Sequence, residues 1–86
     1  MKTYKVIEPN TGEIFHDAVE YEIHILPCPD AALENYLLDG DRNGWFYDGY
    51  PQGREYHVLC VETGVVTKHI VNTEFEPSFV ISDKRD

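Results

Sequence analysis

One short segment, Asp39-Gly40-Asp41-Arg42-Asn43-Gly44, carries side-chain oxygens at alternate positions. Calcium is bound by carboxylate and carbonyl oxygens, and alternate residues of a tight loop can turn such groups toward one ion. A glycine after the third of these residues lets the backbone bend sharply around the ion. We therefore expect Asp39, Asp41 and Asn43 to be candidate calcium ligands.

This pattern resembles the first half of an EF-hand-type calcium loop, with Gly44 at the sixth position and the Trp45 carbonyl at the seventh. At the twelfth position Tyr50 replaces the glutamate that would bind with both carboxylate oxygens, so Asp48 or Glu55 would have to supply the missing oxygens. The pattern predicts weak calcium binding at most.

The same segment has a plainer interpretation. Gly40 can end a helix, and Asn43-Gly44 is a common turn sequence whose neighbouring acids face water. Under this interpretation no metal is bound.

The histidines offer a second kind of metal chemistry. If the second predicted hairpin pairs Val61 with Val65, His57 comes directly opposite His69, with Glu55 beside them. Two imidazoles in that arrangement could bind zinc or act as a pH sensor. A shift of one residue in the pairing would remove the arrangement, because it moves a side chain to the other face.

Catalytic arrangements are sparse. The two serines, Ser78 and Ser82, lie in no Gly-x-Ser-x-Gly motif, and the chain has no glycine-rich phosphate loop. A Cys60 nucleophile with His57 or His69 as its base is compatible with the residue types, but a cysteine in a buried strand is usually an inert packing residue. We expect no enzymatic activity, and we expect the two cysteines to be free thiols, because disulfide scaffolds carry four or more.

An aromatic segment, residues 45–56, combines one tryptophan, one phenylalanine, three tyrosines and an arginine with aspartate and glycine. Binding hot spots use this composition, because aromatic rings and arginine provide a large contact area at a low entropic cost. A small domain also needs large side chains to fill its core. We predict that Phe46 points inward and that Trp45, Tyr47 and Tyr50 contact a partner.

The elements that must position these residues follow from hydrophobic periodicity and turn residues. Alternation predicts strands over residues 2–8, 13–16, 19–26, 54–62, 65–72 and 78–82, with hairpins at residues 9–12 and at Thr63-Gly64. Residues 30–38 are the one convincing helix. Together they predict an α+β fold: a mostly antiparallel sheet of about five strands, in two hairpins, with one short helix packed on it. The length of 86 residues suits one domain, residues 1–86.

The formal net charge of −9 is unevenly distributed, because no lysine or arginine occurs between Val6 and Asp41. That stretch contains nine acids: Glu8, Glu13, Asp17, Glu20, Glu22, Asp30, Glu34, Asp39 and Asp41. A field of this kind repels nucleic acid and anionic membranes, and it steers a basic protein surface toward the chain. No apolar run is long enough to cross a bilayer, so we expect a cytoplasmic location and no membrane partner.

Together these features predict a small acidic protein-binding module that docks on the basic, nucleic-acid-binding surface of another protein. Phage-encoded inhibitors of host nucleases or of restriction and CRISPR effectors are often acidic domains of this size and some mimic DNA, which is an analogy of class only. The predicted contacts are the carboxylates of Glu20, Glu22, Asp30, Glu34, Asp39 and Asp41 and the rings of Trp45, Tyr47 and Tyr50. The alternative function is a weak calcium-binding module, and no other cofactor is expected.

Overall fold

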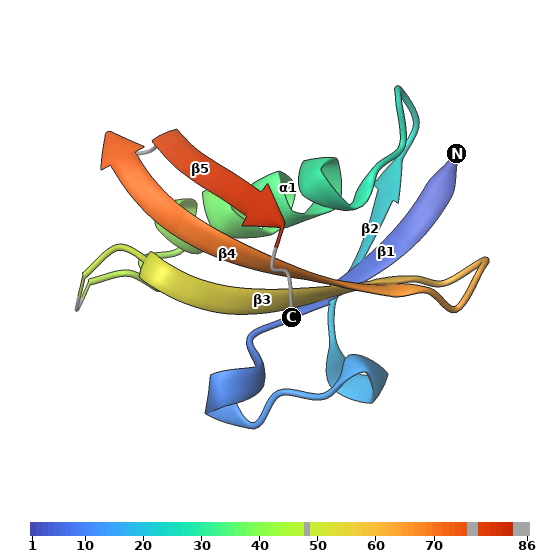
Figure 1. Ribbon diagram of the computed structural model, residues 1–86, viewed down its shortest axis with the longest axis horizontal. Coiled ribbons are helices and arrows are strands. Elements are labelled where there is room, and N and C mark those ends of the chain that lie inside the picture. Colours follow the sequence, from blue (N-terminus) through green and yellow to red (C-terminus); the bar gives the residue numbers. More distant parts are fainter. Residues whose placement is uncertain (48, 76–77, 84–86) are drawn as a thin grey trace.

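Five strands form one antiparallel sheet in the computed structural model, which describes residues 1–47, 49–75 and 78–83 (Figure 1). The elements are β1 (Lys2–Ile7), short 3₁₀ turns at Pro9–Thr11 and Phe15–Asp17, β2 (Glu20–Ile23), α1 (Pro29–Arg42), β3 (Gln52–Cys60), β4 (Val66–Phe75) and β5 (Ser78–Asp83). The strand order is β2-β1-β3-β4-β5. The predicted α+β class is therefore confirmed.

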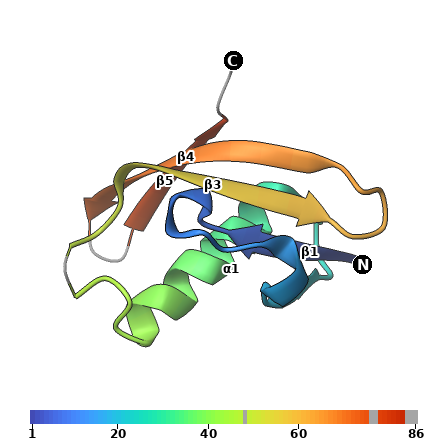
Figure 2. The same ribbon diagram turned by 90° about the horizontal axis from the view of Figure 1, so that it is seen from below.

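The helix α1 packs on one face of the curved sheet and contacts β1, β2, β3 and β5 (Figure 2). Pro29 occupies its first turn, where a missing N–H costs nothing, and Asp30 follows in the same turn, where a negative charge is favoured. Its buried residues recur at a spacing of three and four, as an amphipathic helix requires: Ala32, Leu33, Tyr36, Leu37 and Gly40. None of the helices formed by the described residues combines the length and the apolar character needed to cross a membrane.

The core lies between α1 and the sheet. Alternate residues of the two central strands point into it, among them Tyr4 and Val6 of β1 and Tyr56 and Val58 of β3, all of them almost fully buried. The alternation predicted for these two strands is thus the one that the structure uses.

The first predicted hairpin is wrong. Residues 13–16 do not form a strand, and β1 pairs instead with β2, with Tyr4 opposite Tyr21, and with β3, with Tyr4 opposite Cys60. Both edges of β1 are occupied by these longer-range partners. Residues 8–19 therefore form a connection with two short 3₁₀ turns, which Figure 1 shows projecting beyond the sheet.

The strand predicted over residues 19–26 is shorter than expected. Lys2, the first residue of β1, pairs with Ile23, so the residues after Ile23 have no length of β1 left to pair with. Ile25 and Leu26 consequently lie at the surface, and Leu26 adopts a positive φ of 48° before the Pro27 break.

Tyrosines packed between α1 and the sheet make the stability of the fold sensitive to alkaline pH. Tyr36 packs edge-on against Tyr21 and Tyr56, with ring centroids 6.4 and 5.8 Å apart. Burial raises the pKa of Tyr21 and of Tyr56 to about 12, and it raises the pKa of Tyr36 well above its usual value. The folded state therefore retains these phenolic protons after the unfolded chain has lost them.

We expect the thermal midpoint to fall as the pH rises above about 10, where unfolded tyrosines ionise, and to go on falling toward about 12. Stability is present below the unfolded pKa and is lost as the pH rises through the folded pKa. The check is the thermal midpoint measured across this pH range. The midpoint of Tyr56→Phe should decline less steeply with pH than that of the parent, whereas the midpoint of the exposed Tyr47→Phe should decline as steeply as that of the parent. Equal slopes in all three proteins would contradict the argument.

Candidate binding surface

The chain that follows α1 folds back onto the last turns of the helix. The Trp45 N–H donates to the Gly40 carbonyl (2.8 Å), and Gly44 adopts a positive φ of 75°, which glycine tolerates. At Gly40 a Cβ atom would lie 2.7 Å from Trp45 Cε3 and 3.0 Å from Phe46 Cζ. A glycine inside the helix is therefore what lets the two aromatic rings approach its backbone.

The prediction that Phe46 points inward is confirmed. Its side chain is 8% exposed, and its ring lies 5.6 Å from the ring of Tyr50 and 6.0 Å from that of Phe79 on β5. Tyr50 is partly buried in the same cluster, and its hydroxyl donates to the Asp41 carboxylate. Tyr50 therefore acts mainly within the fold and is a poorer candidate anchor than the sequence indicates.

Trp45 and Tyr47 flank Phe46 and are both exposed. Trp45 is 48% exposed and rests one part of its indole against Tyr36, at a centroid distance of 5.3 Å. Tyr47 is 86% exposed. The structure thus presents two of the three predicted aromatic contacts at the surface, next to the C-terminal end of α1.

The six predicted acidic contacts divide between two faces of the molecule. Glu20 and Glu22 lie on the sheet face away from α1, because Tyr21 and Ile23, which alternate with them, pack on the core side. The other four, Asp30, Glu34, Asp39 and Asp41, are on α1. A single acidic surface made by all six is therefore not formed.

On α1 the acids again point to two sides. Glu34 lines a hollow with Ser78 and Phe79 of β5, and Asp41 accepts the hydrogen bond from Tyr50 in the cluster next to it. Asp39 is on the side that faces Tyr21 and lies 3.8 Å from the Arg42 guanidinium.

Several of the basic side chains are held by carboxylates. Lys5 lies 3.7 Å from Glu20, Arg42 lies 3.8 Å from Asp39, and Arg54 lies 3.4 Å from Glu8. Within the described ranges no basic side chain lies within 4 Å of the Glu34 carboxylate. The negative charge at this part of α1 is therefore not neutralised locally.

The calcium-loop hypothesis required a loop that begins at Asp39. Instead α1 continues to Arg42, four residues beyond its predicted end, so Asp39 and Asp41 lie in its last turn. The Asn43 side-chain amide donates to the Asp39 carbonyl (2.8 Å), and Asp41 is engaged by Tyr50. Both interpretations of the segment are corrected, because a calcium loop does not begin at Asp39 and the helix does not end at Gly40. Gly40 lies inside the helix, and Asn43 follows its end.

Of the residues invoked to complete that loop, Asp48 lies outside the described residues, and Glu55 lies on β3 and makes a close hydrogen bond with the His57 ring. Asp39, Asp41 and Asn43 are thus not arranged around a common point. Calcium binding by these residues stays a prediction, and the loop conformation on which it was based is not formed.

The predicted pairing of His57 with His69 is wrong by one residue. A four-residue turn, closed by the Cys60 N–H on the Val65 carbonyl (2.9 Å), places Tyr56 opposite His69 and His57 opposite Lys68. The two histidines therefore lie on opposite faces of the sheet. Cys28 is exposed, Cys60 is buried, and both are free thiols.

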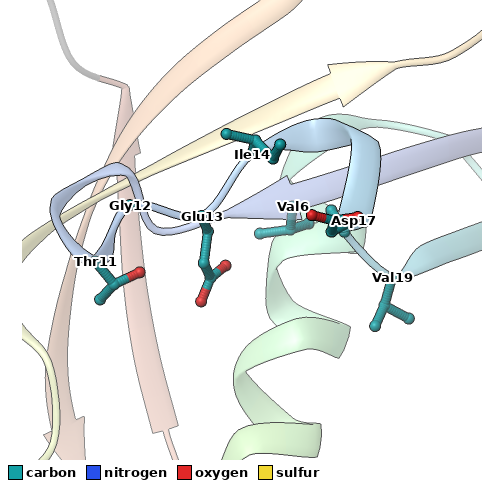
Figure 3. A pocket seen from close by; sticks show the side chains of 8 residues that line it. Val6, Thr11, Gly12, Glu13, Ile14, Asp17 and Val19 are labelled. Atoms are coloured by element: carbon teal, nitrogen blue, oxygen red, sulfur yellow. The ribbon is translucent and has the colours of Figure 1, made fainter.

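A hollow of about 480 Å³ lies between β1 and the connection that precedes β2 (Figure 3). Glu13 lines it, but its carboxylate is used within the fold: it accepts the Glu8 N–H (3.2 Å) and lies 3.5 Å from the Tyr36 hydroxyl. Thr11 also lines it, and its hydroxyl donates to the Glu8 carbonyl (2.8 Å). The hollow contributes nothing to the surface described above.

One group of side chains was not predicted from the sequence. Asp30, His69 and Asp83 converge from three different elements. Only the pairing of β4 with β5 and the packing of α1 bring them together, so no local sequence signal could have indicated the group.

Comparison with protein-family models, with curated proteins and with solved structures finds no match to this chain.

Proposed function

We propose that this chain is a small acidic protein-binding module that docks onto a basic surface of another protein through the part of α1 from Glu34 onward and the loop that follows it. Trp45 and Tyr47 act as the apolar anchors, and Glu34 and Asp41 supply the negative charge. The partner belongs to the class of nucleic-acid-binding proteins, such as a nuclease or a restriction or CRISPR effector.

The observation that carries this proposal is the contrast between adjacent aromatic residues. Phe46 is buried, whereas Tyr47 beside it is 86% exposed and is not needed to fill the core. A large exposed ring beside a half-exposed tryptophan is the composition of an interface hot spot.

Charge supports the choice of partner. The chain carries a formal charge of −9, and Lys5, Arg42 and Arg54 are each engaged by a carboxylate of the chain itself. A protein with a basic surface would be attracted at long range, whereas nucleic acid would be repelled.

The spacing of the acids fits a surface that normally binds nucleic acid. Seven residues separate Glu34 from Asp41, which corresponds to about 10 Å along a helix axis. This is close to the axial distance between phosphates about three nucleotides apart on one strand of duplex DNA. The two carboxylates could therefore occupy two phosphate sites of such a partner that are about three nucleotides apart.

Reversing the charge of Glu34 is expected to weaken partner binding by about tenfold at low salt, mainly through slower association. The partner is first captured on the immobilised chain from a lysate at low salt and then purified, and the affinities of Glu34→Lys and the parent are measured from low to high salt. The difference between the two proteins should shrink as salt screens the charge.

Glu22→Lys is the matched control, because it makes the same charge change at an exposed site on the opposite face of the sheet. It should have the smaller effect at every salt concentration. If Glu22→Lys weakens binding and Glu34→Lys does not, the docking surface is the sheet face and the assignment to α1 is wrong.

Competition tests the nature of the partner surface. Duplex DNA should displace the chain from the purified partner, and the chain alone should not retard the same DNA in a gel. A ternary complex of partner, DNA and chain would contradict the proposal that the chain occupies a nucleic-acid-binding surface.

A further inference from the structure

A buried histidine faces two carboxylates near the N-terminal end of α1. His69 of β4 is 2% exposed, and its Nδ1 lies 3.5 Å from Asp30 Oδ1 and 3.4 Å from Asp83 Oδ1. His69 and Asp83 are direct partners in the pairing of β4 with β5, and Asp30 lies in the first turn of α1. One ligand atom from each residue lies within 4.8 Å of the other two.

The other ring nitrogen is already engaged within the fold. Nε2 lies 2.7 Å from the Thr67 hydroxyl, which also lies 3.5 Å from the Val58 carbonyl oxygen. In the tautomer in which Nε2–H donates to this hydroxyl, the lone pair of the neutral ring is on Nδ1. Metal-binding histidines are commonly oriented in this way, by a hydrogen bond from the ring nitrogen that does not bind the ion.

Nδ1 is buried and has no hydrogen-bond partner within the described residues, although it faces two carboxylate oxygens. In the tautomer with the proton on Nε2, three acceptor atoms from α1, β4 and β5 converge without a donor between them. A cation is the group that such an arrangement lacks.

We propose that Asp30, His69 and Asp83 form a binding site for a divalent transition-metal ion of the zinc class. In a tetrahedral zinc site with ligand bonds of about 2.0–2.2 Å, neighbouring ligand atoms are about 3.3–3.5 Å apart. The two distances from Nδ1, 3.5 and 3.4 Å, match that spacing. The carboxylates of Asp30 and Asp83 are 56% and 75% exposed, so the fourth position is open to water.

The donor set also selects the ion. One imidazole nitrogen with two carboxylate oxygens suits zinc and its neighbours in the first transition row, whereas calcium requires six to eight oxygens at longer distances. Bound zinc would join the start of α1 to the end of the edge strand β5. The site shares no residue with the proposed docking surface, whose nearest member, Glu34, lies one helical turn after Asp30.

The test titrates ZnCl₂ into the metal-free full-length chain near neutral pH and follows the heat of binding and the thermal midpoint. One zinc ion should bind per chain, and at a zinc concentration about a hundredfold above Kd the midpoint should rise by about 10 °C. CaCl₂ and MgCl₂ at the same concentration should leave the midpoint unchanged. A parent chain that shows no response to zinc up to about 1 mM overturns the proposal.

Variants locate the ion. Asp30→Asn and Asp83→Asn alter exposed side chains, so they should fold, and each should weaken zinc binding at least tenfold. Glu34→Gln, one helical turn after Asp30, is the matched control and should bind zinc like the parent. Equal affinities in all four proteins would show that the ion binds elsewhere.

Cobalt distinguishes this site from the free thiols. Co²⁺ bound by nitrogen and oxygen ligands should give visible bands without the strong near-ultraviolet band of a thiolate ligand, and Cys28→Ser should leave the spectrum unchanged. A thiolate band that disappears in Cys28→Ser would overturn the assignment. An ion pair between a protonated His69 and the two carboxylates is the remaining alternative, and a chain that folds fully but ignores both metals would support it.

Discussion

Replacing Phe46 with alanine is expected to lower the free energy of unfolding by about 3–5 kcal/mol. The ring is 8% exposed and lies between Tyr50, Phe79 of β5 and the backbone of Gly40. Its removal would leave a cavity where α1, the loop that follows it and the edge strand meet. A loss of this size is a large part of the stability of a domain this small.

Denaturant unfolding measures this loss, and Tyr47→Ala is the control, since it removes a similar ring from the next residue. With 86% of its side chain exposed, Tyr47 should change the free energy of unfolding by no more than about 0.5 kcal/mol. Phe46→Leu, which retains most of the buried volume, should fall between the two. Equal losses for Phe46→Ala and Tyr47→Ala would mean that the loop is not packed as described.

Tyr47→Ala is expected instead to weaken partner binding by on the order of 2 kcal/mol, which corresponds to about thirtyfold in Kd. Charged contacts mainly govern the rate of association, whereas a desolvated ring slows dissociation. The loss should therefore appear as a faster dissociation rate, with an unchanged thermal midpoint.

Dissociation rates and thermal midpoints are measured on the same set of variants. Tyr47→Phe retains the ring and should keep most of the affinity. Trp45→Ala should change both quantities, because Trp45 is only 48% exposed and also packs on Tyr36. If Tyr47→Ala dissociates as slowly as the parent, the aromatic loop does not anchor the partner.

The sequence by itself determined the kinds of elements and the faces that they bury. Buried residues alternate in β1 and β3, and in α1 they recur at helical spacing, as at Leu33, Tyr36 and Leu37. The strand period of two residues and the helix period of 3.6 residues can both be recognised in the sequence without knowing which segments are neighbours. The α+β class followed from the same information, and the inward position of Phe46 followed from the need of a small domain for large side chains in its core. The uneven charge is likewise a property of the sequence alone.

The tertiary structure decided which segments pair and in which register. Lys2 pairs with Ile23 and so ends β2 early, and α1 continues to Arg42, where the calcium hypothesis needed a loop. Local patterns contain neither fact, because each depends on hydrogen bonds between residues far apart in the chain or on how the following loop packs.

The hairpin between β3 and β4 shows the same limit most clearly. A turn one residue longer than predicted places His69 on the other face of the sheet from His57, and the separate pairing of β4 with β5 places it opposite Asp83. Because side chains alternate between the two faces of a strand, a shift of one residue in the β3–β4 pairing places the His69 ring on the other face of the sheet, among different neighbours. The composition supplied the histidine and the two aspartates, but only the pairing of β4 with β5 and the packing of α1 placed them around one point.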